Sequence, residues 1–163
     1  MSPAVVLIGP MGAGKTKVGR RVARLLGLDF VDTDKVIVAA HGPIAQIFSE
    51  QGEPAFRALE RQAVVDALES DGVVSLGGGA VLDPATRADL AAQRVVLLTV
   101  GARAVEGRLG QGKRPLIRDG VGDWQRIYDE RRPLYQEVAD LELDTSHRPF
   151  DVIAEEVAAW ART

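Results

Sequence analysis

The sequence predicts one α/β domain built on a parallel β-sheet with helices on both faces. Three observations support this: a length of 163 residues, five short apolar runs separated by helical patterns, and a glycine-rich loop between the first run and the first helix. A chain of this length usually forms a single domain. Strands that alternate with helices pair in parallel, because each helix returns the chain to the edge where the strand began.

The predicted strands are short and leave room for helices between them. They cover residues 4–8, 29–31, 73–76, 94–99 and 141–143. Helical patterns cover 17–26, 35–70, 83–92, 102–109, 122–139 and 151–160, with breaks at 41–43 and 52–54. We expect Arg131-Arg132-Pro133 to interrupt the helix over 122–139, because proline has no N–H to donate. In the last helix, the apolar face is expected to consist of Val152, Ile153, Val157 and Trp160.

The loop from Gly9 to Thr16, G-P-M-G-A-G-K-T, fits the phosphate-binding pattern G-x-x-x-x-G-K-[ST]. Its glycines let successive backbone N–H groups point at phosphate oxygens, and the following helix adds its positive N-terminal end. Lys15 is expected to reach the β- and γ-phosphates, and Thr16 to offer its hydroxyl to Mg²⁺. The alternative is an ordinary glycine turn, but the strand before the loop and the helix after it favour a nucleotide-phosphate site.

Composition excludes several classes of function. The net charge of -3 and a pI of about 5.4 argue against a protein that binds nucleic acids or membrane surfaces through a basic face. The sequence has no cysteine, so disulfides, thiolate metal sites and cysteine nucleophiles are excluded. No apolar run approaches the roughly 18 residues that span a bilayer, and no leader pattern precedes the first strand. We therefore expect a cytoplasmic protein and, since no extended apolar patch is evident, a monomer.

Polar groups follow the second and third strands, at the sheet edge where ligands bind in such folds. Asp32 and Asp34 come first: one would lie near Mg²⁺, directly or through water, and the other would face an acceptor hydroxyl. The alternative has Asp32 or Thr33 capping the next helix. The third strand runs into Gly77-Gly78-Gly79. These glycines either let the backbone approach a ligand closely or form a flexible turn. Because that strand carries no terminal aspartate, Asp32 is the candidate for the metal.

Two basic features admit both a functional and a structural interpretation. Arg57 and Glu60 are three apart on a helix, which predicts either a surface ion pair or an arginine that grips a carboxylate substrate. The glycine-rich, basic segment over about 110–120, with Arg114, predicts a lid that closes on triphosphate and excludes water. Its alternative is a mobile surface loop. The loop over 146–149 lies at the same sheet edge and is well placed to hold adenine.

Taken together, these motifs resemble the shikimate kinase family over residues 5–160. Besides the phosphate-binding loop, they are D-T-D at 32–34, F-R-x-x-E at 56–60, G-G-G-A at 77–80, R-P-L at 114–116 and R-x-P-L-Y at 131–135. The resemblance implies a three-layer P-loop NTPase fold in which helices flank a five-stranded parallel sheet of order 2-3-1-4-5. It also implies one domain over 1–163, substrate-binding helices over about 33–62 and a short mobile lid over about 110–120.

The resemblance implies ATP-dependent phosphorylation of the 3-hydroxyl of shikimate, in the route to chorismate and aromatic amino acids. The implied catalytic residues are Lys15, Asp34 and Arg114, and the implied shikimate-binding residues are Asp34, Arg57, Gly78, Gly79 and Arg131. The implied ATP-binding residues are Gly12, Ala13, Gly14, Lys15, Thr16, Lys17, Arg108, Arg114 and Arg148, and Mg²⁺ is assigned to Thr16 and Asp32. The implied partners are small-molecule substrates, with no nucleic acid and no membrane.

Three other functions compete with this one. A gluconate-type kinase could use the same scaffold, but the two matched arginines and the glycine run argue against it. A P-loop regulatory module would not need Asp34, Arg57 and Arg131 to converge on an acceptor. An adenylate-kinase-like enzyme would phosphorylate a mononucleotide instead.

Overall fold

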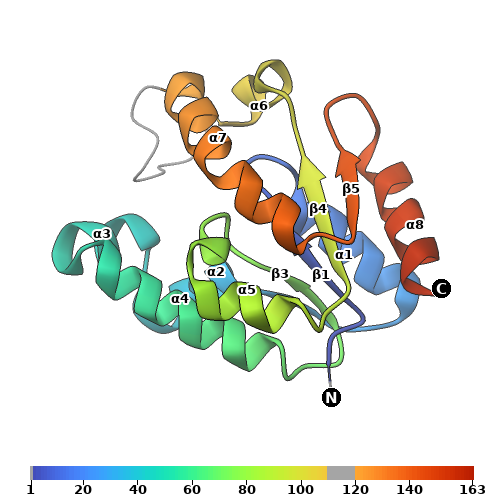
Figure 1. Ribbon diagram of the computed structural model, residues 1–163, viewed down its shortest axis with the longest axis horizontal. Coiled ribbons are helices and arrows are strands. Elements are labelled where there is room, and N and C mark those ends of the chain that lie inside the picture. Colours follow the sequence, from blue (N-terminus) through green and yellow to red (C-terminus); the bar gives the residue numbers. More distant parts are fainter. Residues whose placement is uncertain (1, 110–119) are drawn as a thin grey trace.

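The computed structural model describes residues 2–109 and 120–163, and it contains a parallel sheet with helices on both faces (Figure 1). The strands are β1 (Val5–Ile8), β2 (Phe30–Asp32), β3 (Val73–Ser75), β4 (Val95–Thr99) and β5 (Leu141–Asp144). Their order across the sheet is β2-β3-β1-β4-β5, and every neighbouring pair is parallel. The predicted fold class and strand order are therefore confirmed.

The helices connect these strands and form the two outer layers. Their bounds are α1 (Lys15–Leu26), α2 (Thr33–His41), α3 (Ile44–Gln51), α4 (Glu53–Ala67), α5 (Pro84–Leu90), α6 (Ala102–Leu109), α7 (Val121–Val138) and α8 (Phe150–Ala161). Helices α1 and α8 pack together on one face, and α4, α5 and α7 cover the other (Figure 1). Within the described ranges, no helix combines the length and the apolar character that crossing a membrane requires.

Two predictions about helices are wrong. Helix α7 continues through Pro133, because buried aromatic residues on both sides of the proline, Trp124 and Tyr135, anchor the helix to the core. The proline then costs a single helical hydrogen bond. Val152 is 42% exposed, because the inward face of α8 consists of Ile153, Ala154, Val157 and Ala158 instead.

The buried apolar side chains form two separate clusters. The larger one surrounds the sheet and includes nearly all of β1 and β4, which are buried on both faces as expected for central parallel strands. The smaller one lies among α2, α3 and α4 and consists of Ile37, Ile47, Phe56 and Ala63. The sheet core therefore supports the loop over 9–16, and the small cluster supports the helices that follow β2.

Candidate active site

Contacts from three other elements hold the phosphate-binding loop between β1 and α1. Gly14, before α1, has a φ of 95°, and a Cβ there would lie 2.7 Å from the ring of Phe150, so the position requires glycine. Carbonyls of three successive loop residues accept side-chain hydrogen bonds. The pairs are Met11 with Trp124 Nε1, Gly12 with Arg108 Nη1 and Ala13 with Thr145 Oγ1, each at 2.7 Å. These contacts fix the loop peptides from α7, α6 and the end of β5.

A cavity of about 340 Å³ opens beside this loop. Lys15 Nζ donates to the carbonyls of Gly9 and Pro10 at 2.6 and 3.1 Å, which holds the ammonium group over the loop. The cavity is lined by Met11, Gly12, Gly14, Lys15, Thr16, Lys17, Asp32, Asp34, Ser75, Leu76, Gly78, Arg108 and Phe150. Most of the predicted ATP-binding residues thus share one cavity with Asp34, while Ala13 is buried and does not line the cavity.

Thr16 and Asp32 are in direct contact within this cavity. The Thr16 hydroxyl donates to Asp32 Oδ2 at 2.5 Å, while Asp32 Oδ1 accepts from the backbone N–H of Lys35 at 3.3 Å. Asp32 therefore caps α2, as the structural alternative held, and also faces the loop. Neutral and anionic oxygens are the donors that Mg²⁺ prefers. No group of three histidine, aspartate or glutamate side chains gathers in the described part of the chain.

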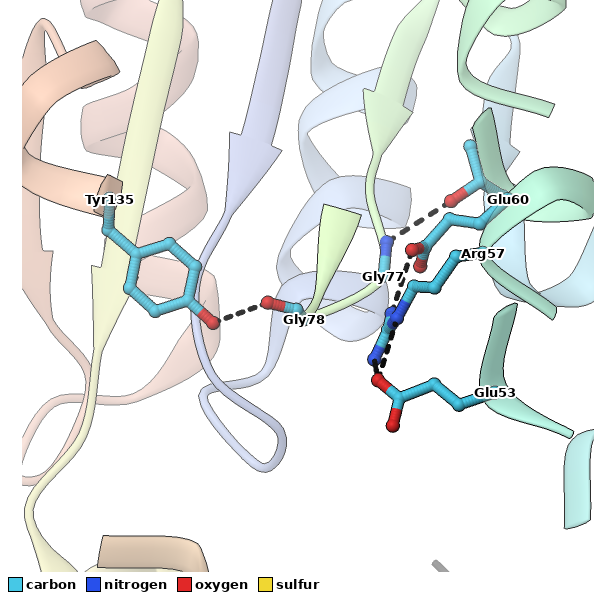
Figure 2. Close-up of polar contacts among 7 residues, drawn as sticks. Glu53, Arg57, Glu60, Gly77, Gly78 and Tyr135 are labelled. Atoms are coloured by element: carbon cyan, nitrogen blue, oxygen red, sulfur yellow. Dashed lines mark hydrogen bonds and ion pairs between the residues drawn. The ribbon is translucent and has the colours of Figure 1, made fainter. Parts of the chain in front are cut away.

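Arg57 and Glu60 form a partly buried ion pair on α4 (Figure 2). Arg57 Nη1 lies 2.8 Å from Glu60 Oε1, and Arg57 Nη2 lies 3.2 Å from Glu53 Oε2. Only 4% of the Glu60 side chain is exposed, and this burial raises the pKa of its carboxyl, although the nearby charge of Arg57 opposes the shift. The ion pair that one of the two interpretations predicted is therefore present, but it is partly buried and not on the open surface.

The glycine run after β3 makes close contacts with both sides of the site. Gly77 N–H donates to Thr33 Oγ1 at 3.1 Å, and the Gly78 carbonyl accepts from the Tyr135 hydroxyl at 2.6 Å (Figure 2). A Cβ on Gly79 would lie 2.3 Å from Arg57 Nη1, so any side chain there would displace the guanidinium. Close approach, rather than a loose turn, is what these glycines allow.

The remaining predicted arginines lie in different surroundings. Arg131 is buried, and its Nη1 would lie 3.6 Å from a Cβ on Gly78, whereas Arg132 is exposed. Arg108 lies over the Phe150 ring, 5.0 Å from its centroid. Arg148 does not line the cavity, and its guanidinium pairs with Glu156 at 3.2 Å. Arg114 and nearly all of the predicted lid over 110–120 lie outside the described residues.

Sequence reasoning missed two aromatic side chains at this site. Phe150 packs against Gly14 and lines the cavity, and its place directly after the loop over 146–149 was the available signal. Tyr135 binds a carbonyl that is 57 residues away in the sequence, and no local pattern predicts such a contact.

Comparison with known proteins agrees with the geometry. The family model for shikimate kinase matches residues 11–162. Shikimate kinase from Saccharopolyspora erythraea is 49% identical over 96% of this chain and 93% of its own length, and that from Corynebacterium efficiens is 47% identical over 94% of both. The solved structure of shikimate kinase from Acinetobacter baumannii in complex with shikimate has a TM-score of 0.92 and 32% identity, over 98% of this chain and 92% of that one. This chain belongs to the shikimate kinase family.

Proposed function

We propose that this chain transfers the γ-phosphoryl group of ATP to the 3-hydroxyl of shikimate, which gives shikimate 3-phosphate and ADP in the route to chorismate and aromatic amino acids. The observation that carries this proposal is the convergence of Asp34, Arg57 and Arg131 on a glycine run that adjoins a phosphate-binding loop. The likeness to a structure that holds shikimate supports the choice of acceptor.

The donor half of the site binds the triphosphate of ATP. Backbone N–H groups of Gly12 to Thr16 surround the phosphates, and Lys15 neutralises charge that develops on the transferred group. Lys17 and Arg108 also line the cavity, and we assign them to the nucleotide. Arg148 is assigned to the adenine through the family resemblance, and Arg114 is assigned to the transferring phosphoryl group on the same basis.

The divalent metal that kinases of this kind use is Mg²⁺ in our proposal. Thr16 and Asp32 fit it, because a hydroxyl and a carboxylate oxygen already lie side by side in the cavity. When bound, the metal supplies positive charge to the phosphate oxygens. Thr16 and Asp32 would hold the ion, and the hydrogen bond between them also connects the start of α1 to the residue that caps α2.

The acceptor half positions the attacking hydroxyl. Arg57 and Arg131 grip the shikimate carboxylate, and the N–H groups of Gly78 and Gly79 face the acceptor and the γ-phosphate. Asp34 orients the 3-hydroxyl and takes its proton as the oxygen–phosphorus bond forms and the bond to the ADP oxygen breaks. Phosphoryl transfer depends mainly on such positioning and on charge stabilisation, so no covalent intermediate is required.

Coupled measurement of ADP release with Mg²⁺ and ATP tests this proposal. We expect turnover with shikimate and none with gluconate or AMP. Shikimate alone, at 100 times its dissociation constant, should stabilise the fold by about 2.7 kcal/mol, which a thermal shift detects without nucleotide. Turnover with another acceptor would contradict the carboxylate grip, and no ADP with any acceptor would favour a regulatory module.

We further propose that residues 1–163 act as one domain in a monomer, in the cytoplasm, where ATP is available. Both halves of the site come from the same chain, so no second copy is needed to complete it. Sedimentation equilibrium at assay concentrations tests the monomer, and a single transition in differential scanning calorimetry tests the single domain.

A further inference from the structure

Tyr135 connects helix α7 to the glycine run from the side opposite Arg57. Its hydroxyl donates to the Gly78 carbonyl at 2.6 Å, and its side chain is almost completely buried, with 1% of the residue exposed. Figure 2 shows Tyr135 and Arg57 on the two sides of the run. A buried tyrosine hydroxyl that binds one particular carbonyl is a specific feature, because leaving either group without a partner would cost about 1–3 kcal/mol.

The hydrogen bond determines where the next N–H group points. The carbonyl of Gly78 and the N–H of Gly79 belong to one peptide, which is trans, so the two groups point in opposite directions. With the carbonyl directed at Tyr135 on α7, the Gly79 N–H points away from α7, to the side of the run on which Arg57 lies (Figure 2). That N–H has no acceptor among residues 2–109 and 120–163, so it is available to a ligand.

Glycine makes this peptide easy to rotate. Neither Gly78 nor Gly79 has a Cβ to restrict its backbone angles, so local sterics alone do not choose one orientation. The 3₁₀ turn that follows, Ala80–Leu82, uses the carbonyls of Gly77 and Gly79 and leaves the one between them to Tyr135. The contact from α7 is therefore what fixes the peptide.

The surroundings of Tyr135 keep its hydroxyl protonated, so that it can donate a hydrogen bond. Burial raises its pKa to about 12, while the nearby charge of Arg131 opposes the shift. The group stays protonated over the whole range in which an enzyme of this kind would be assayed. The Tyr135 hydroxyl thus binds the glycine run within the electrostatic influence of Arg131, the second predicted carboxylate-binding arginine.

We propose that Tyr135 is a positioning residue that turns the Gly78–Gly79 peptide so that the Gly79 N–H binds the anionic acceptor beside Arg57, an inference that rests on the proposed function. The contact to the acceptor would be the same in the ground state and in the transition state. Losing it should therefore raise KM for shikimate and leave kcat nearly unchanged.

The test compares Tyr135→Phe with Tyr128→Phe. Tyr128 lies two turns earlier on the same helix, in the same group of aromatic rings, and its hydroxyl binds none of the described residues, so it is a matched control. For Tyr135→Phe we expect KM for shikimate to rise about ten-fold, the size of one hydrogen bond, with kcat within about two-fold and the dissociation constant of ATP unchanged. Tyr128→Phe should match the unaltered chain in all three.

Two results would overturn the inference. One is an unchanged KM for shikimate in Tyr135→Phe. The other is a parallel loss of ATP and shikimate affinity, because a general loss of structure would affect both. Should the variant fold poorly, selective ¹⁵N-glycine labelling of the unaltered chain gives an independent answer: the Gly79 amide resonance must shift when shikimate binds, and a resonance that does not respond refutes the proposal. An unaltered chain that does not phosphorylate shikimate would instead refute the proposed function.

Discussion

The loop over 9–16 and the glycine run over 77–79 lie at the same edge of the sheet, but they are held in different ways. The loop is one continuous segment, and its own Lys15 donates to the carbonyls of Gly9 and Pro10. Side chains from α6, α7 and the end of β5 add to these local contacts. The glycine run instead depends on side chains from elsewhere: Thr33 from α2, Arg57 from α4 and Tyr135 from α7. The donor half of the site thus combines local and tertiary contacts, whereas side chains from three other helices hold the glycine run of the acceptor half.

Removal of the loop lysine should give the largest effect and confine it to the donor half. In Lys15→Met, the charge that stabilises the transferring phosphoryl group is lost, so we expect kcat to fall about 1,000-fold. Calorimetric titration should find the affinity for shikimate unchanged. If shikimate binding weakened in step with kcat, the two halves would not be separable as described.

Removal of one arginine from the acceptor half should weaken the binding of shikimate and leave the binding of ATP unchanged. Arg57→Ala should weaken shikimate binding about 100-fold, the size of a charge-assisted hydrogen-bond pair, and leave ATP affinity unchanged. Arg61→Ala is the matched control, because Arg61 lies one turn further along α4 and pairs with Asp89 instead. Equal loss of both ligands in Arg57→Ala would mean that the residue only supports the fold.

The two apolar clusters allow the stability of the acceptor-side helices to be compared with that of the sheet core. Ile47→Ala should cost about 2 kcal/mol, because it leaves a cavity in the small cluster among α2, α3 and α4. Hydrogen exchange should then accelerate in these helices more than in β1 and β4. Leu97→Ala, in the sheet core, should accelerate exchange in both regions. Uniform acceleration in Ile47→Ala would show that the clusters unfold together.

The smallest effect should be a pH dependence that originates at Glu60. Burial raises the pKa of this carboxyl above its ordinary 4.5, while Arg57 and Arg131 lower it and Asp34 raises it further. A raised pKa contributes stability below pH 4.5 that is lost as the pH rises through the folded-state value. The melting temperature of the unaltered chain, minus that of Glu60→Gln, should therefore fall by a few degrees from pH 4 to pH 8. A difference that grows with pH would mean that the charge of Arg57 outweighs burial.

The difference between local patterns and tertiary contacts also explains which features the sequence predicts well. Strands such as Val95–Thr99 are recognisable from unbroken apolar runs, and the loop over 9–16 from its own pattern, because local chemistry determines both. The strand order follows from family resemblance and not from any local pattern. The outcome at Pro133 was missed because tertiary packing overrides a local preference. The role of Tyr135 needs the relative placement of α7 and β3, which only the folded chain provides.

The separate cluster under α2, α3 and α4 has a consequence for evolution. Because these side chains pack with one another, mutations can reshape the acceptor half while the sheet core keeps its packing. Under selection for a new anionic acceptor, residues 33–63 should therefore collect changes, in addition to those at Arg131, while residues 9–16 stay as they are. In this sense the fold separates the part of an enzyme that is free to diversify from the part that must be inherited unchanged.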